Sequence, residues 1–326
     1  MITSLNELKE LADKKKCTND NSHQELRVCM SSSCMSLGSA ELGKSLQDEL
    51  QNRELNDKYK IKSVGCNGLC ANGTLVSHCR GDDSTLYEKI TTLDTKDLVD
   101  SIQNGGLLKD KMCDITQPFF TKQTKIVLEN AGIIDPDDIE DYIAHGGYIA
   151  LFKALDGMTP KEVIEEVKIS ALRGRGGGGY PAGIKWESVS KVISEQKYII
   201  CNGDEGDPGA FMDRAVMESD PHRVLEGMAI AGYACGANKG YIYVRAEYPL
   251  AVEKLGRAIK QATKLGILGE NIAHSNFSFS IEIRLGAGAF VCGEATALIA
   301  SVEGNRGNPR QKPPHLTDYG LWGKPT

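Results

Sequence analysis

Alternating hydrophobic and polar residues predict a series of short strands in the first third of the chain. Four segments alternate with the period of a half-buried strand: 26–28, 59–64, 75–77 and 85–87. Leucines at positions 42, 46 and 50 predict a helix after the first strand, and residues 95–103 a closing helix. A turn is expected at 81–83. This order of strand, helix, three strands and helix is typical of a small thioredoxin-like domain.

From residue 197 onward, strands and helices alternate instead. Short apolar runs, as in buried strands, are each followed by a segment with helical periodicity. The expected elements are strands at 197–201, 240–246 and 277–285, and helices at 222–234, 249–265 and 294–302. The pattern predicts a Rossmann-like α/β layer structure, in which ligands bind beyond the carboxyl ends of the strands.

Breaks in the pattern divide the chain into three predicted parts. Gly105-Gly106 ends the first, and Pro118 lies just beyond it. A helix is expected to begin at Thr159-Pro160, with threonine as its cap and proline in its first position. We therefore expect a thioredoxin-like domain at 1–107, a helical connector at 108–158 and an α/β domain at 159–326.

Charge and composition exclude some classes of function. The chain has 326 residues and a net charge of −6, so it lacks the basic surface that nucleic-acid binding requires. Its N-terminal residues show neither the apolar core of a secretory signal nor the Arg-rich face of a transit peptide. We expect a cytoplasmic protein that binds no nucleic acid and does not insert into a membrane.

Ten cysteines are the first indication of chemistry, because a reducing compartment favours metal ligation over disulfides. Two pairs, with spacings C-x4-C and C-x3-C, each follow a predicted strand; they are Cys29, Cys34, Cys66 and Cys70. If these strands are parallel neighbours, the four thiolates meet at one edge and suit a [2Fe–2S] cluster. Zinc and plain buried cysteines are the alternatives, although structural zinc sites usually have tighter C-x2-C spacings. Cys17, Cys79 and Cys113 have no partner at such a spacing and are interpreted as structural.

A glycine-rich segment at 173–186 is the second indication. Six of its glycines fall within ten positions, so its backbone can present N–H groups to an anion or lie flat against a ring system. Arg173, Arg175 and Lys185 add positive charge, which favours a phosphorylated cofactor. A flexible linker is the alternative, but linkers seldom contain Trp, Tyr and flanking cations. An ordinary Rossmann fingerprint is not indicated, because residues 163–172 have a helical pattern.

Two polar loops follow predicted strands of the α/β part, at 202–209 and 286–294. Acidic residues facing a cationic glycine loop would also suit Mg²⁺ and a nucleoside triphosphate. Since the G-x4-GK-[ST] motif of such sites is missing from the sequence, redox chemistry is favoured over phosphoryl transfer.

Five ordered motifs together resemble one family: Arg173–Trp186, Cys201–Arg214, Tyr241–Tyr248, Gly286–Gly304 and Pro309–Thr326. This family is the flavin- and nicotinamide-binding subunit of respiratory complex I, NAD-reducing hydrogenases and bifurcating hydrogenases. The N-terminal thioredoxin-like [2Fe–2S] domain narrows the resemblance to the hydrogenase-type diaphorase subunits. It implies an FMN-dependent NAD(P)H:acceptor oxidoreductase that passes hydride from NADH to FMN and electrons to iron–sulfur clusters.

The resemblance also implies roles for individual residues. FMN is expected on the glycine loop and Lys185, with Asn202, Asp204 and Glu205 hydrogen-bonded to it. NAD(H) is expected against Phe290 and Lys312, with Glu294 close to the stacked flavin and nicotinamide. The residues expected to act in catalysis are Glu205, Asp207 and Glu294. The full set expected to bind cofactors is Gly174, Arg175, Gly176, Gly177, Gly178, Gly179, Lys185, Asn202, Asp204, Glu205, Phe290, Gly293, Glu294, Ala295, Lys312 and His315.

The sequence departs from the family pattern near the nicotinamide nucleotide. Ala295 stands where the family often has a Glu that repels a 2′-phosphate, and His315 stands at a typically aromatic position. Both changes make NADPH easier to tolerate. Asp207 replaces a frequent Glu and is one methylene shorter.

The family pattern also continues beyond Thr326, with an Asn-Asn pair, a ubiquitin-like domain and a [4Fe–4S] domain. We therefore expect a fragment or one half of a split subunit, with any [4Fe–4S] cluster in a missing part or a partner. The expected partners are iron–sulfur and catalytic subunits of a hydrogenase-like or complex I-like assembly. The alternative function is a non-catalytic [2Fe–2S] electron relay or docking module of such an assembly.

Overall fold

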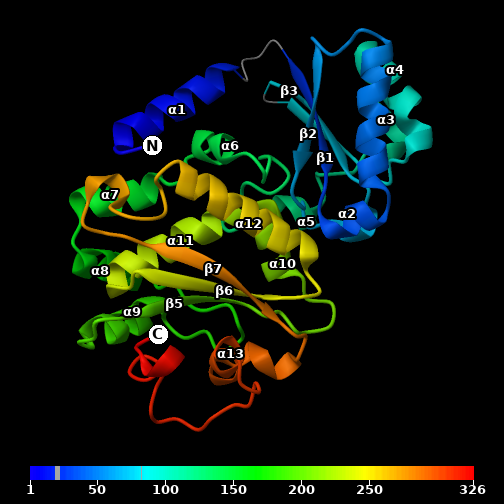
Figure 1. The fold of residues 1–326 in the computed structure, drawn as a ribbon. Coiled ribbons are helices and arrows are strands. Elements are labelled where there is room, and N and C mark those ends of the chain that lie inside the picture. The colour runs from blue at the N-terminus through cyan, green and yellow to red at the C-terminus, as the bar shows by residue number, and fades with distance from the viewer. Residues whose placement is uncertain (19–22, 82) are drawn as a thin grey trace. The chain divides into compact units, whose positions relative to one another are not determined.

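The computed structural model describes residues 1–18, 23–81 and 83–326, which form two compact units (Figure 1). The larger unit contains residues 1–11, 146–214 and 221–326, and the smaller unit contains residues 12–145 and 215–220. Among the described residues, no helix is both long and apolar enough to span a membrane.

A four-stranded mixed sheet forms the smaller unit, in the order β2-β1-β3-β4. Strands β1 (Gln24–Cys29) and β2 (Tyr59–Val64) are parallel, while β3 (Val76–Arg80) and β4 (Asp83–Tyr87) run antiparallel to their neighbours. The helices of this region are α2 (Ser32–Ser36), α3 (Ser39–Asn52) and α4 (Thr95–Gln103). This order and pairing confirm the predicted thioredoxin-like topology. The predicted turn at 81–83 includes Asp82, which lies outside the described residues.

The core of this sheet follows from the spacing of apolar residues. Leu42, Leu46 and Leu50 of α3 are fully buried against Leu26 and Val28 of β1. A four-residue spacing places the three leucines on one face of α3, and alternate residues of β1 point to that face. The same spacing predicted the helix from the sequence.

A three-stranded parallel sheet, ordered β5-β6-β7, forms the centre of the larger unit. Its strands are β5 (Tyr198–Gly203), β6 (Lys239–Arg245) and β7 (Ser280–Gly286). Helices α11 (Pro221–Cys235) and α12 (Pro249–Lys264) connect them and pack on one face. Helix α13 (Ala295–Val302) and Leu316 pack on the other face, against Tyr241 and Tyr243 of β6. These helix, sheet and helix layers confirm the predicted α/β architecture (Figure 1).

The remaining helices surround these two sheets. They are α1 (Leu5–Thr18), α5 (Pro118–Thr121), α6 (Ile139–Ala144), α7 (Ile149–Gly157), α8 (Pro160–Ile169), α9 (Ala182–Lys191) and α10 (Met212–Ser219). Short 3₁₀ turns occur at Cys70–Asn72, Thr92–Asp94, Lys109–Lys111, Ile272–His274, Phe290–Gly293 and Leu321–Gly323.

The division into two units differs from the predicted boundaries at two places. The segment 108–145 lies in the smaller unit, where Asp141 pairs with Lys62 at 2.7 Å. The first eleven residues lie in the larger unit, where the Ile2 N–H donates to the Leu265 carbonyl at 2.7 Å. The boundaries 1–107, 108–158 and 159–326 stay a prediction about domains.

Helix α10 was not predicted, because its first turn is stabilised from a distance. The Glu205 carboxylate accepts hydrogen bonds from the N–H groups of residues 212, 213 and 214, at 2.8, 3.1 and 3.3 Å. A capping carboxylate usually comes from the residue directly before the helix. Here it comes from seven residues upstream, so no local cap marks the helix start.

Candidate functional site

The four predicted cysteine ligands lie together at the carboxyl ends of β1 and β2. Cys29 ends β1 opposite Val64, Cys66 follows two residues later, and Cys34 and Cys70 lie on α2 and the next 3₁₀ turn. The Cys29 thiol contacts Cys34 and Cys66, and the Cys66 and Cys70 sulfurs are 3.4 Å apart. Hydrogen bonds to Cys34 and Cys66 and then burial raise the pKa of Cys29, whereas its bond to Cys29 lowers the pKa of Cys34.

The surroundings of these thiols suit a [2Fe–2S] cluster. Three of the four thiols are buried with Leu75, and all ten cysteines are free of disulfides. The Gly68 N–H donates to the Cys66 sulfur at 3.2 Å, a type of bond that stabilises a thiolate. Within 1–18, 23–81 and 83–326, no group of His, Cys, Asp and Glu has the arrangement that a single metal ion needs. The thiols contact one another instead, so ligation would require them to lose protons and separate.

The glycine-rich segment is a closed loop between α8 and α9. The Gly174 N–H donates to the Tyr180 carbonyl at 2.9 Å, and Arg173 forms a bridge with Pro181 at the base of the loop. Gly177 has φ of +90° and Gly179 of +58°, values that favour glycine. A Cβ built at any position from Gly176 to Gly179 meets open space within 4 Å. This fixed base and open tip differ from a flexible linker and leave room for a ligand.

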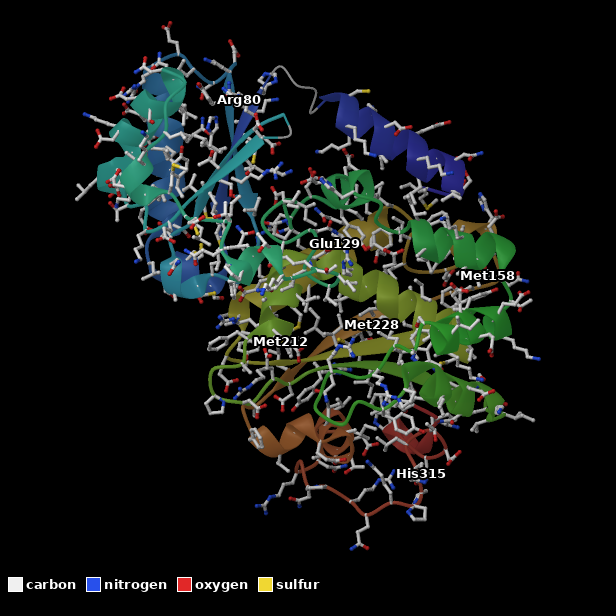
Figure 2. All side chains as sticks on the ribbon, turned by 180° about the vertical axis from the view of Figure 1, so that it is seen from behind. Arg80, Glu129, Met158, Met212, Met228 and His315 are labelled. Atoms are coloured by element: carbon white, nitrogen blue, oxygen red, sulfur yellow. The ribbon has the colours of Figure 1, made fainter. Side chains whose placement is uncertain are left out.

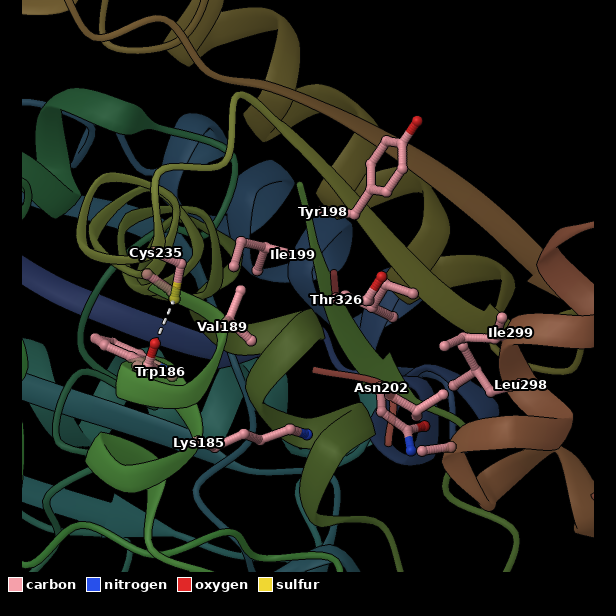
Figure 3. A pocket seen from close by; sticks show the side chains of 14 residues that line it. Lys185, Trp186, Val189, Tyr198, Ile199, Asn202, Cys235, Leu298, Ile299 and Thr326 are labelled. Carbon is pink, nitrogen blue, oxygen red and sulfur yellow. Dashed lines mark hydrogen bonds between the residues drawn. The ribbon is translucent and has the colours of Figure 1, made fainter. Parts of the chain in front are cut away.

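A cavity of about 170 Å³ lies beside the first strand of this sheet, between α9, α11 and α13 (Figure 3). It contains three predicted site residues: Lys185, Asn202 and Ala295. Solvent reaches the Lys185 side chain through the cavity, but protein surrounds most of it. This partial burial, and then the positive charge of Lys312, lower the pKa of Lys185. Apolar and aromatic residues complete the wall: Trp186, Val189, Tyr198, Leu298, Ile299 and Leu316.

The loops after β5 and β7 meet at Asn202 and Asp204. The Asn202 amide donates to the Gly293 carbonyl at 2.9 Å, and a Cβ on Gly293 would lie 3.3 Å from the Asp204 carbonyl oxygen. The Asp204 side chain is only 1% exposed, and its Oδ2 has no hydrogen-bond partner among the described residues. Burial raises the pKa of Asp204, although the nearby Arg245 guanidinium opposes the shift.

Two of the predicted catalytic acids differ in their surroundings. Glu205 caps α10, and its backbone carbonyl accepts from Arg245 at 2.8 Å and from the Tyr248 hydroxyl at 3.1 Å. Asp207 is exposed on the same loop. Glu205 also raises the pKa of the neighbouring Asp213 to about 6, after the larger effect of burial.

The third predicted acid, Glu294, caps α13 by accepting from the N–H groups of Thr296 and Ala297, and pairs with Lys312 at 3.2 Å. Burial opposes ionisation, but hydrogen bonds from Thr296 and Lys312 prevail and lower the pKa of Glu294. Phe290 is 66% exposed and packs over Gly206, and His315 is exposed on the segment after α13 (Figure 2).

The predicted cofactor residues thus form three groups: the glycine loop, the cavity with Lys185, and the loops at the ends of β5 and β7. Asn202 belongs to both of the last two groups. Sequence reasoning missed Arg245 and Tyr248 as site residues, although both lie in the motif at 241–248. Their position directly after β6, between two loops of the site, is the signal that could have indicated them.

FMN fits these residues on three observations. The glycine loop has open space above its backbone, a mostly buried cation projects into the cavity, and Asp204 Oδ2 is a buried acceptor without a donor. A phosphate group suits the two cationic regions, and a hydroxyl or ring N–H suits Asp204.

Comparisons with known proteins agree with this assignment. Residues 167–322 match the family described as the Nuo51 FMN-binding domain. Over 205 residues, the chain is 58% identical to the NADP-reducing hydrogenase subunit HndC of Solidesulfovibrio fructosivorans, covering 63% of this chain and 41% of that protein. Over 188 residues, it is 52% identical to an NADH-quinone oxidoreductase subunit of Aquifex aeolicus, covering 58% and 44%. The chain therefore spans less than half the length of either relative.

A solved structure shares the fold across both units. It is an NAD⁺-reducing [NiFe]-hydrogenase in the air-oxidized state, which covers 97% of this chain with a TM-score of 0.52 and 22% sequence identity. The alignment covers 55% of the hydrogenase chain.

Proposed function

Because residues 167–322 belong to the family of the Nuo51 FMN-binding domain, we propose that this chain is the diaphorase module of an NAD(P)H:acceptor oxidoreductase. The observation that carries the proposal is the cavity, which collects Lys185, Asn202 and Ala295 inside the matched segment. The names of the curated relatives, an NADP-reducing hydrogenase subunit and an NADH-quinone oxidoreductase subunit, support the same activity.

In this proposal each group of residues has a separate task. When bound, FMN accepts a hydride from the nicotinamide and releases electrons one at a time. Arg175 and Lys185 would hold the phosphate of FMN, and the glycine loop would let the flavin lie close to the backbone. Asn202 and Asp204 would fix the orientation of the flavin by hydrogen bonds.

The nicotinamide nucleotide is assigned to the exposed side of the site. Phe290, Lys312 and His315 would contact it, and Asp207 would lie near the carboxamide. Glu294 stays ionised through its bonds to Thr296 and Lys312, so its negative charge would act on the nearby flavin. Glu205 would act mainly by holding α10 and the loop in place.

The smaller unit would carry the electron exit. Cys29, Cys34, Cys66 and Cys70 are proposed to hold one [2Fe–2S] cluster, on the strength of their mutual contacts and burial. The partners would be iron–sulfur and catalytic subunits of a hydrogenase-like or complex I-like assembly, and any [4Fe–4S] cluster would belong to them or to a further segment of the protein. The cytoplasm is the proposed location.

Removing the charge of Lys185 tests the flavin assignment. Lys185→Met should weaken FMN binding at least tenfold in a fluorescence titration of the purified chain, because a charge-assisted phosphate contact is lost. Lys191→Met is the matched control, since Lys191 lies on the same helix with a 69% exposed side chain. Equal FMN affinity in the two variants would refute the placement of FMN in this cavity.

A further inference from the structure

Arg245 connects the two loops that border the candidate flavin site. It is the last residue of the central strand β6, so the loops after β5 and β7 lie on either side of it. One guanidinium nitrogen donates to the Glu205 carbonyl at 2.8 Å, and another to the Gly288 carbonyl at 3.4 Å. The planar fork of an arginine can serve two acceptors in different directions, which a lysine ammonium does less well.

The same guanidinium lies next to the buried carboxylate of Asp204. Arg245 Nε is 3.8 Å from Asp204 Oδ1, and the Arg245 and Asp204 side chains are 17% and 1% exposed. Neither Arg245 Nε nor Asp204 Oδ2 has a hydrogen-bond partner among the residues the structure describes. A buried carboxylate without a nearby cation is costly, so this arrangement places a negative acceptor at the floor of the site.

We infer that Arg245 is a positioning residue for the flavin: it sets the spacing of the two loops and keeps Asp204 as a carboxylate that accepts a hydrogen bond from FMN. This inference rests on the proposed function, because it assigns Asp204 to FMN. Arg245 itself acts through Glu205, Gly288 and Asp204.

The two tasks of Arg245 predict different responses to pH. The charged groups that act on Asp204 are Arg245, which favours its ionised form, and Glu247, which opposes it; Tyr243 of β6 also interacts with it. FMN affinity should fall as the pH falls and Asp204 takes up a proton. Without the guanidinium charge, Asp204 should take up this proton at a higher pH.

Two substitutions of Arg245 separate the tasks. Arg245→Met removes both the bridge and the charge, so FMN affinity should fall at least tenfold and its pH midpoint should move to higher pH. Arg245→Lys keeps the charge but not the fork, so affinity should fall while the midpoint stays near that of the wild type. The FMN phosphate titrates identically in every variant, so differences between midpoints report the protein.

Arg284→Met is the control, because Arg284 lies on the adjacent strand β7 and pairs with Glu282 at 3.0 Å. It should leave FMN affinity and the midpoint unchanged. A midpoint in Arg245→Met equal to that of the wild type would overturn the inference, whatever the affinity of that variant.

A second measurement needs no flavin. The Asp204 carboxyl can be titrated by NMR in the apo chain with ¹³C-labelled aspartate, its signal being identified by loss in Asp204→Asn. Its titration should move to higher pH in Arg245→Met, and no movement would overturn the coupling. If the wild type binds no FMN while this coupling is present, the proposed function fails and the link between Arg245 and Asp204 remains.

Discussion

The cysteine group and the candidate flavin site are assembled in opposite ways. The four cysteines come from two parallel strands and the turns that follow them, and the thiols contact one another in an apolar surrounding. The flavin residues come from a loop between two helices, from a cavity wall and from the ends of β5 and β7. Most of the residues in these loops are exposed, and their polar groups bond to backbone atoms.

The difference affects how each site responds to substitution. A metal cluster needs all of its ligands, and no neighbouring residue replaces a lost thiolate. A flavin site distributes its binding energy over many contacts, so single changes should produce graded losses. The following predictions use this contrast, from the largest expected effect to the smallest.

Removing one cysteine ligand should abolish the cluster. Cys66→Ser is expected to lose most or all of its iron and acid-labile sulfide in chemical analysis of the reconstituted chain. Cys79→Ser is the control, because Cys79 is also buried but lies in β3, outside the group. Iron content in Cys66→Ser equal to that of the control would contradict the ligand assignment.

A branched side chain in the glycine loop should expel FMN. Gly177→Val places a Cβ in the open space of the loop at φ of +90°, where the flavin is proposed to lie. Gly146→Val is a matched control, because Gly146 has the same φ of +90° and equally open surroundings outside the loop. Both variants should lose similar stability, but only Gly177→Val should lose bound flavin. Flavin loss in both would indicate general destabilisation.

A carboxylate at residue 295 should select against NADPH. Ala295 lines the cavity at the start of α13. A negative charge about 4 Å from the 2′-phosphate costs roughly 1 to 4 kcal/mol per unit charge, a tenfold to several-hundredfold discrimination. In the FMN-loaded protein, Ala295→Glu should therefore lower kcat/KM for NADPH far more than for NADH. The wild type should still prefer NADH, but by a narrower margin, and equal losses for both donors would show that residue 295 does not face the ribose.

The smallest expected effect concerns Asp213, whose pKa burial and the charge of Glu205 raise to about 6. Because the folded-state pKa lies above the unfolded value, Asp213 favours folding at low pH, and that contribution is lost as the pH rises through about 6. After allowance for solvent screening, Asp213→Asn should stabilise the chain by about 1 kcal/mol at pH 8, a Tm increase of about 2 to 4 °C. The gain should shrink at pH 5. Asp156→Asn, at an exposed position, is the control, and an equal gain at both pH values would contradict the assignment.

The sequence predicted the scaffold well because each sheet has a buried face. The spacing of Leu42, Leu46 and Leu50 indicated a helix, and alternation indicated the strands of the smaller unit. The cysteine group was also predictable, since parallel neighbouring strands end at the same edge. Two contacts between distant residues were not predictable. Glu205 caps α10 across seven positions, and Arg245 reaches Gly288 across 43.

The separation of the two sites also explains why the sequence left two functions open. A chain with only the cysteine group would be an electron relay, whereas a chain with both sites would be a diaphorase. The residues of the flavin site were expected from the family resemblance, and their roles stay predictions until they are tested by substitution.

The absorption spectrum of the purified chain, reconstituted with FMN, iron and sulfide, tests the central claim most directly. Recorded under argon before and after addition of NADH, it should first show separate flavin and [2Fe–2S] bands, and the flavin band should then bleach. A chain that shows only the cluster band, or a bound flavin that NADH leaves unchanged, would contradict the diaphorase assignment and leave the electron relay as its function.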